Sequence, residues 1–271
     1  MTGEFGPWLQ RFHPAAESAV RLFCFPHAGG TAASYIKLSL ALAPDLEVLA
    51  VQYPGRQDRF DEPCVDSIDR LADLAADALL DLVGPARAGG RPFALFGHSM
   101  GATLAFEVAL RLERAGAPAL ALIASGQAAP SLQAGSAARL SDDETLLAGI
   151  RKLGQTDPRV LDDAGLLRLI FPAIRADHHA AEGYRYTPGP PLQCPVSVLI
   201  GESDPDVTMA GARAWRRHTN ADFAFGQLPG GHFYLKQHTE GVAARITEAI
   251  AVGRRNRIAE AVATAAGPAS G

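Results

Sequence analysis

The sequence predicts an α/β protein with a mostly parallel central sheet flanked by helices. Short apolar runs rich in β-branched and aromatic residues recur along the chain, and helical patterns separate them. The runs lack polar alternation, which is typical of strands buried on both faces of a parallel sheet. A chain of 271 residues suits one domain built around one such sheet.

The expected strands are six apolar runs, of which RLFCF is the first. In chain order the runs start at Arg21, Glu47, Pro92, Ala119, Pro195 and Phe223. Helical patterns lie between and after the runs, at residues 31–43, 66–83, 100–116, 208–218 and 233–252. The alternation of the two patterns is what places helices on the faces of a parallel sheet.

The alternation breaks between residues 127 and 191. This segment has helical patterns near 141–153 and 160–183, and it closes with TPGPP, a sequence that stops regular structure. We expect a helical insertion over the sheet, with a linker as the alternative. Residues 253–271 are Ala-rich with scattered charges and end in GPASG, so we expect a flexible C-terminal tail.

Charge and cysteine content exclude several classes of protein. A formal net charge of −4 gives no general attraction to nucleic acid or anionic lipid, so we expect neither as a partner. No apolar run approaches the roughly 20 residues that span a bilayer. Three cysteines at no metal-like spacing, and no signal-peptide pattern, predict a cytoplasmic protein. We expect it to be a monomer, with Cys24 an apolar filler in its strand.

The motif GHSMG at residues 97–101 predicts a nucleophilic serine. It follows an apolar strand and precedes a helix, and a sharp turn between these elements exposes a hydroxyl above the sheet. A side chain at Gly97 or Gly101 would crowd such a turn. We therefore expect Ser99 to be the nucleophile, the alternative being an ordinary turn serine.

A serine hydroxyl needs a base to accept its proton, and the base needs an orienting carboxylate. The strand that starts at Pro195 is followed by GESDPDV, and the last strand is followed by PGGHF. We expect Asp204 to be the acid, with Asp206 as its competitor, and His232 to be the base. The order Ser99, Asp204, His232 is that of α/β-hydrolases, and all three follow the carboxyl ends of strands.

Acyl transfer also needs backbone donors for the oxyanion. Met100 follows the nucleophile at the start of a helix and supplies one N–H group. The second should come from the loop PHAGG after the first strand, whose glycines allow close approach to a ligand. We expect this second donor to be Ala28, within one residue.

With these residues identified, the sequence resembles the type II thioesterases, discrete α/β-hydrolases that work beside modular polyketide and nonribosomal peptide synthases. The matching stretches are LFCFPHAGG at 22–30, VQYPGR at 51–56, FGHSMGA at 96–102, GESDPDV at 201–207 and PGGHFYL at 229–235. The resemblance implies removal of acyl groups from the phosphopantetheine thiol of acyl or peptidyl carrier protein domains. It also implies a helical lid at 127–191 and an acyl-serine route that requires no metal and no dissociable cofactor.

Other polar residues have competing interpretations. We expect His27 and His98 to pack or brace loops, since the base role falls to His232. Arg56 either braces a loop near the site or meets an acidic carrier, and Asp177 with the two histidines after it suggests a surface or a lid lining. Basic residues that could meet a carrier are Arg151, Lys152, Arg213, Arg216 and Arg217.

Three alternative functions share these motifs. A small-molecule esterase or lipase would use the same three residues on oxygen esters. An integrated thioesterase that ends synthesis by macrocyclisation is disfavoured, because the chain starts at Met1 and has no room for a carrier domain. A non-catalytic partner could keep the fold as a docking surface, although intact Ser99, Asp204 and His232 argue against it.

Overall fold

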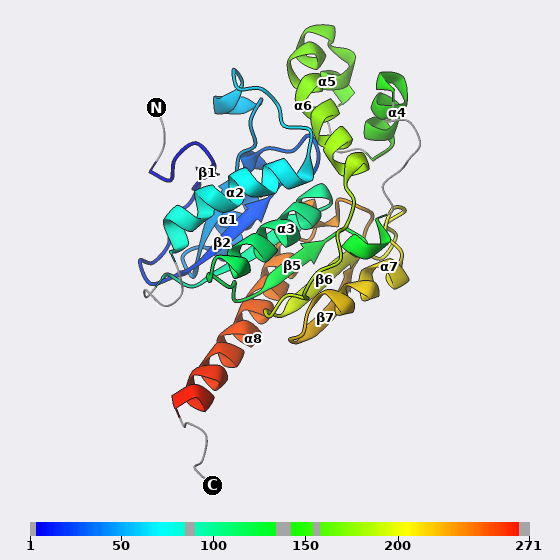
Figure 1. Ribbon diagram of the computed structural model, residues 1–271. Helices are drawn as coiled ribbons and strands as arrows, with labels where there is room; N and C mark the ends of the chain where they lie inside the picture. The colour runs from blue at the N-terminus through cyan, green and yellow to red at the C-terminus, as the bar shows by residue number, and fades with distance from the viewer. Residues whose placement is uncertain (1–3, 85–89, 134–141, 154–157, 266–271) are drawn as a thin grey trace.

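The computed structural model describes residues 4–84, 90–133, 142–153 and 158–265. One seven-stranded sheet forms the centre of the molecule (Figure 1). Its order is β1-β3-β2-β4-β5-β6-β7, and all neighbours are parallel except β1 and β3. The strands are β1 (Leu9–Gln10), β2 (Val20–Phe25), β3 (Leu46–Val51), β4 (Phe93–His98), β5 (Leu122–Ser125), β6 (Val196–Gly201) and β7 (Phe223–Leu228). The predicted α/β fold is confirmed; the short strand β1 carries no pattern that could have predicted it.

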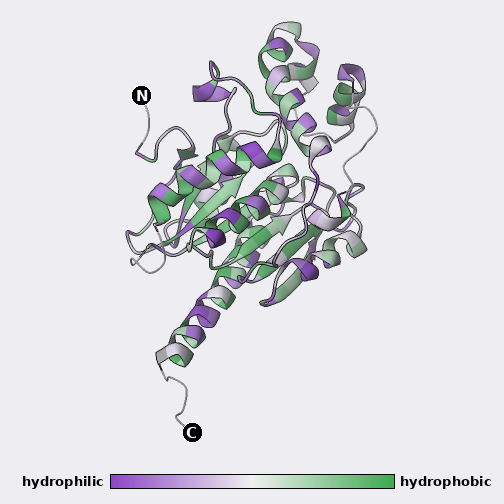
Figure 2. Ribbon diagram, viewed as in Figure 1, coloured by the Kyte–Doolittle hydropathy of each residue, from purple (hydrophilic) through white to green (hydrophobic). Residues whose placement is uncertain are grey.

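Helices cover both faces of the sheet, and the side-chain alternation of each strand explains how. In β2, Phe23 and Phe25 join a core with residues of α2 and α3, whereas Leu22 and Cys24 join a second core with residues of α1 and α8. Figure 2 shows the strands mainly in hydrophobic colours, as expected for a sheet covered on both sides. The helices are α1 (Ile36–Leu42), α2 (Ile68–Val83), α3 (Met100–Arg114), α7 (Met209–Arg213) and α8 (Thr239–Ala265).

In the described part of the segment 127–191, three further helices lie between β5 and β6. They are α4 (Asp143–Leu153), α5 (Pro158–Asp162) and α6 (Ala164–Gly183). They project from the main body (Figure 1) and share a small core made by Leu146, Ile150, Leu161 and Ile174. At the far end of α6, Tyr184 Oη donates a hydrogen bond to Glu107 Oε1 of α3 at 2.7 Å, which ties the insertion to the main domain.

The predicted start of a tail at residue 253 is wrong, because α8 continues as a helix to Ala265. Gly253, the first residue of the expected tail, allows close packing within the helix: a Cβ atom there would lie 1.9 Å from the carbonyl oxygen of Leu120. The Ala-rich sequence beyond it has high helix propensity, although Ile258 and Val262 are exposed. Residues 266–271 lie outside the described part of the chain. Neither α8 nor another helix of the described ranges is long and apolar enough to cross a membrane.

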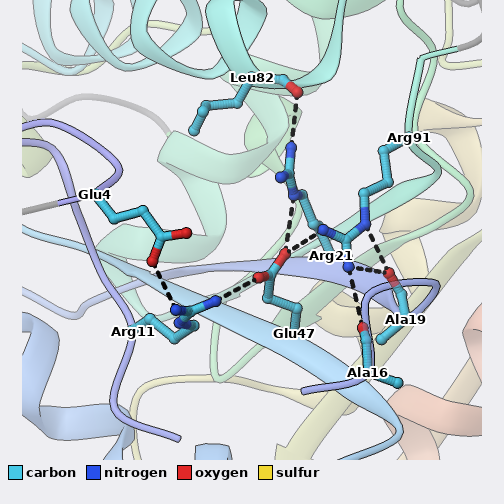
Figure 3. Close-up of polar contacts among 8 residues, drawn as sticks. All are labelled: Glu4, Arg11, Ala16, Ala19, Arg21, Glu47, Leu82 and Arg91. Atoms are coloured by element: carbon cyan, nitrogen blue, oxygen red, sulfur yellow. Dashed lines mark hydrogen bonds and ion pairs between the residues drawn. The ribbon is translucent and has the colours of Figure 1, made fainter. Parts of the chain in front are cut away.

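A buried carboxylate holds the amino ends of the strands together, opposite the end where the candidate site lies. Glu47, at the start of β3, is 4% exposed and accepts contacts from three arginines (Figure 3). Arg11 Nη1 lies 3.1 Å from Oε1, while Arg21 Nε and Arg91 Nη1 each lie 2.9 Å from Oε2. Arg21 and Arg91 also donate to backbone carbonyl groups, so the cluster joins β2, β3 and the segment before β4.

Candidate active site

Ser99 occupies a strained turn between β4 and α3. Its φ of 56° and ψ of −126° lie in a region that side chains other than glycine rarely adopt. The Ser99 N–H donates to the carbonyl oxygen of Ser125 at 2.8 Å, which anchors the turn to the neighbouring strand β5. The residue is half-buried, in the conformation that presents a hydroxyl above a parallel sheet.

The two glycines of the motif are required by close backbone contacts. A Cβ atom on Gly97 would lie 2.0 Å from the carbonyl oxygen of Gly101. A Cβ atom on Gly101 would lie 2.1 Å from the carbonyl oxygen of Phe25 and 2.6 Å from that of Pro26. The predicted crowding is therefore confirmed, and it brings the start of α3 against the end of β2.

The loops after β6 and β7 bring a carboxylate to an imidazole. Asp204 Oδ2 lies 2.9 Å from His232 Nδ1, and neither side chain is more than 7% exposed. The loops approach closely because Gly201 has no side chain, since a Cβ atom there would lie 2.3 Å from the carbonyl oxygen of Gly231. Asp206 is exposed and its N–H donates to Asp204 Oδ1 at 2.9 Å, so Asp204 is the acid that contacts the ring.

The imidazole of His232 lies beside the turn at Ser99 between β4 and α3, here named the elbow. It lies next to the ring of His98 at a centroid distance of 5.1 Å. Within the described ranges, the structure has no hydrogen bond between the Ser99 hydroxyl and His232. Hydrogen bonds of this type are often long in the free enzyme and tighten when substrate binds. The structure thus brings Asp204 and His232 into direct contact and leaves the contact with Ser99 to be completed.

The loop of residues 26–30, here named the oxyanion loop after the role expected of Ala28, lies against the elbow through the contact of Gly101 with Pro26. Ala28 is 9% exposed in this loop, and Met100 is 2% exposed at the first position of α3. A turn shapes the loop: Gly30 N–H donates to the carbonyl oxygen of His27 at 2.8 Å. The two expected backbone donors therefore belong to segments that contact each other, the start of α3 and the loop after β2.

Two other histidines near the site are neutral packing residues. His98 Nδ1 lies 2.9 Å from Ser125 Oγ, which lies 2.6 Å from Tyr234 Oη, and burial lowers the pKa of His98 well below its usual value. Burial also lowers the pKa of His27 to about 3. The His98–Ser125–Tyr234 chain links the elbow to the segment after His232, a connection without a signal in the sequence.

Arg56 braces the oxyanion loop, which is one of the two roles expected for this residue from the sequence. Its Nη1 donates to the carbonyl oxygen of Gly30 at 3.2 Å, and its guanidinium forms a two-point ion pair with Asp177 of α6. Asp177 is fully buried, so the predicted surface or lid-lining role is wrong for this residue. Its partner lies 121 residues away in the chain, which is why no local pattern indicated the pair.

Several of the basic residues considered for carrier contact serve local roles. Arg151 pairs with Asp162 at 2.8 Å, Arg213 lies 4.6 Å from the ring centroid of Phe225, and Arg216 Nη1 donates to the carbonyl oxygen of Thr219 at 3.0 Å. Arg217 is exposed, and the side chain of Lys152 lies outside the described part of the structure.

One cluster has the residue types of a metal site. Ligand atoms of Asp204, Asp206 and His232 lie within 4.8 Å of one another. However, the Asp204 and His232 atoms are joined by a hydrogen bond, and the second oxygen of Asp204 accepts the Asp206 N–H. These three residues fit an oriented imidazole better than a coordinated cation, because both carboxylate oxygens of Asp204 and Nδ1 of His232 already have hydrogen-bond partners.

Comparison with known proteins places this chain in a family. The family described as "Thioesterase domain" matches residues 20–250. A probable cadicidin biosynthesis thioesterase of Streptomyces griseus is 46% identical over 243 residues, which are 90% of this chain and 66% of that protein. The thioesterase PikA5 of Streptomyces venezuelae is 45% identical over 250 residues, 92% of this chain and 87% of that protein.

Solved structures show the same similarity. The type II thioesterase BorB from the borrelidin biosynthetic cluster superposes with a TM-score of 0.80 at 47% identity, covering 90% of this chain and 97% of BorB. YbtT, a type II thioesterase from the yersiniabactin pathway, also has a TM-score of 0.80, at 30% identity, covering 91% of this chain and 99% of YbtT.

Proposed function

This chain belongs to the thioesterase domain family, and from that premise we propose that it hydrolyses acyl thioesters carried by acyl or peptidyl carrier proteins. In this role it serves polyketide or nonribosomal peptide synthesis as a type II editing enzyme. Relatives named for such pathways support the assignment. The observation that carries it is the strained Ser99 elbow beside the buried Asp204–His232 pair.

In the proposed reaction, His232 accepts the proton of Ser99 as its oxygen attacks the thioester carbonyl carbon. The N–H groups of Met100 and Ala28 stabilise the oxyanion of the tetrahedral intermediate. Collapse breaks the carbon–sulfur bond, and His232 returns the proton to the leaving phosphopantetheine thiol. A water molecule, deprotonated by His232, then attacks the acyl-serine; the bond between the acyl carbon and Ser99 Oγ breaks, His232 returns the proton to Ser99, and the acid is released. Asp204 orients the ring throughout and stabilises its charged form. No step needs a metal ion or a dissociable cofactor.

The test compares the wild type with Ser99→Ala on an acyl carrier protein thioester and on the matched oxygen ester. We expect thioester turnover by the wild type, none by Ser99→Ala, and a fluorophosphonate label that depends on Ser99. Ser18→Ala is the matched control, because Ser18 is exposed and lies outside the site. A large preference for the oxygen ester would favour the esterase interpretation, and folded protein without labelling would favour a non-catalytic partner.

A further inference from the structure

The insertion contributes one buried carboxylate to the surroundings of the oxyanion loop. Asp177 of α6 is 0% exposed, and its Oδ2 accepts the Gly29 N–H at 2.7 Å and Arg56 Nη1 at 2.6 Å. Its Oδ1 accepts Arg56 Nη2 at 2.8 Å. This fork is the geometry in which arginine binds carboxylate most strongly. A charge pair and three hydrogen bonds thus join the insertion to the catalytic half of the molecule.

Further anchors of the oxyanion loop come from the main domain. Tyr53 Oη donates to the carbonyl oxygen of Pro26 at 2.9 Å, and Arg56 Nη1 donates to that of Gly30 at 3.2 Å. Tyr53 also lies under the guanidinium of Arg56, at 5.2 Å from ring centroid to Cζ. Asp177 adds a contact from the insertion, so residues of both the main domain and α6 hold the loop.

The contact with Gly29 restricts the neighbouring donor. The Gly29 N–H belongs to the peptide group that follows Ala28, and Gly29 has a φ of 73°, which glycine adopts without strain. Holding that peptide plane limits the rotation of Ala28 and so the direction of its own N–H. Without the carboxylate, the half-buried Gly29 N–H would lose its acceptor and the buried Arg56 guanidinium would lose its charged partner, which favours rearrangement of the loop.

We propose that Asp177 is a positioning residue: paired with Arg56, it holds the oxyanion loop so that the Ala28 N–H faces the oxygen that becomes charged during acyl transfer. The inference rests on the proposed function. Because Asp177 belongs to α6, the conformation of the oxyanion loop depends on the position of this helix relative to the main domain. The insertion then contributes to the chemical step as well as to the walls that surround the acyl chain.

The experiment compares Asp177→Asn with Asp162→Asn, a matched change at an exposed ion pair of the same insertion. Steady-state kinetics use an acyl-pantetheine thioester, with active enzyme counted by fluorophosphonate labelling. Two inhibitors distinguish binding of the oxyanion from binding of the acyl chain. A trifluoromethyl ketone analogue adds to Ser99 and forms an oxyanion, whereas the corresponding amide does not. Thermal unfolding of each variant confirms that it is folded at the assay temperature.

For Asp177→Asn we expect kcat to fall about 10- to 100-fold, with KM within about threefold of the wild type. The affinity for the ketone should fall by the same factor and that for the amide should hardly change. Arg56→Lys, which keeps the charge but loses the fork, should lower kcat as well. The double variant should be little worse than either single variant, because both changes remove one interaction.

An equal loss of affinity for both inhibitors would overturn the proposal, since it would mean that Asp177 shapes the acyl pocket instead of the oxyanion loop. So would kinetics of Asp177→Asn that match those of Asp162→Asn. If an oxygen ester proves to be the better substrate, the proposed function fails, while the same comparison made with that ester still decides the role of Asp177.

Discussion

The contact between the elbow and the end of β2 leads to a quantitative prediction for Gly101→Ala. The added Cβ atom would lie 2.1 Å from the carbonyl oxygen of Phe25, whereas real contacts of this kind are essentially never shorter than 3.0 Å. Helix α3 and the end of β2 must therefore separate by about 1 Å. Since Phe25 leads directly into the oxyanion loop, the shift moves Ala28 relative to Ser99.

A misplacement of about 1 Å at reacting groups costs about 100-fold in rate, so we expect kcat/KM to fall by about that factor. Overpacking costs about 1 to 3 kcal/mol in the free energy of unfolding. For a domain of this size each kcal/mol lowers the melting temperature by about 2 to 4 °C, which gives a decrease of about 2 to 12 °C. Acyl-pantetheine hydrolysis, followed by the released thiol, and thermal unfolding measure the two effects.

Gly149→Ala is the control, because a Cβ atom built at that position of α4 meets nothing within 4 Å beyond its chain neighbours and the backbone of its own helix. We expect this variant to keep wild-type kinetics and to be as stable as the wild type or slightly more stable. Wild-type activity and an unchanged melting temperature in Gly101→Ala would refute the reasoning. A lower melting temperature with full activity would refute the link to the oxyanion loop.

Three further predictions concern charged and titrating groups. Asp204→Asn should lower kcat about 10⁴-fold without unfolding the protein, because the amide favours the wrong tautomer of His232; Asp206→Asn should change kcat only a few-fold. Glu47→Gln should lower the free energy of unfolding by about 2 to 4 kcal/mol in urea denaturation and leave kcat unchanged, since three arginines lose their shared carboxylate far from the site. Burial lowers the pKa of His27 to about 3, so as the pH falls below 6.5 this residue takes up a proton in the unfolded chain but not in the folded protein. Acidification from pH 7 to pH 5 should therefore lower the free energy of unfolding by about 2 kcal/mol through His27. His27→Gln should remove that part of the pH dependence of the unfolding free energy.

Each of these predictions has an outcome that contradicts it. Equal losses of kcat in the asparagine variants at positions 204 and 206 would contradict the assignment of Asp204 as the carboxylate that orients His232. An unchanged urea midpoint in Glu47→Gln would show that hydration of the three arginines compensates for the loss of their shared carboxylate. A pH dependence of stability that is the same with and without the imidazole of His27 would show that this ring does not stay neutral in the folded protein.

The parts of the site that could be predicted are those with a local signature. GHSMG combines a strand, a tight turn and a helix in consecutive residues, and the conformation of Ser99 follows from that combination. Asp204 and His232 were indicated because each follows an apolar strand, and parallel strands end at the same edge of a sheet. Their contact at 2.9 Å is a consequence of the order of β6 and β7 in the sheet.

The parts that could not be predicted depend on partners distant in the chain or on backbone packing. Asp177 resembles any polar residue of a helical pattern until Arg56, 121 positions away, is placed beside it. The Ala-rich composition after residue 252 suggests a tail, whereas in the structure Gly253 packs against Leu120 and α8 continues to Ala265.

The sequence by itself determined six of the seven described strands, most of the helices and the order of the chemically active groups, because hydrophobic periodicity and turn chemistry act between near neighbours. Only the tertiary structure decided which acid contacts the imidazole, where α8 ends, and how α6 reaches the oxyanion loop through Asp177. These depend on the burial of charges and on backbone contacts between distant segments, which leave no periodic trace along the chain.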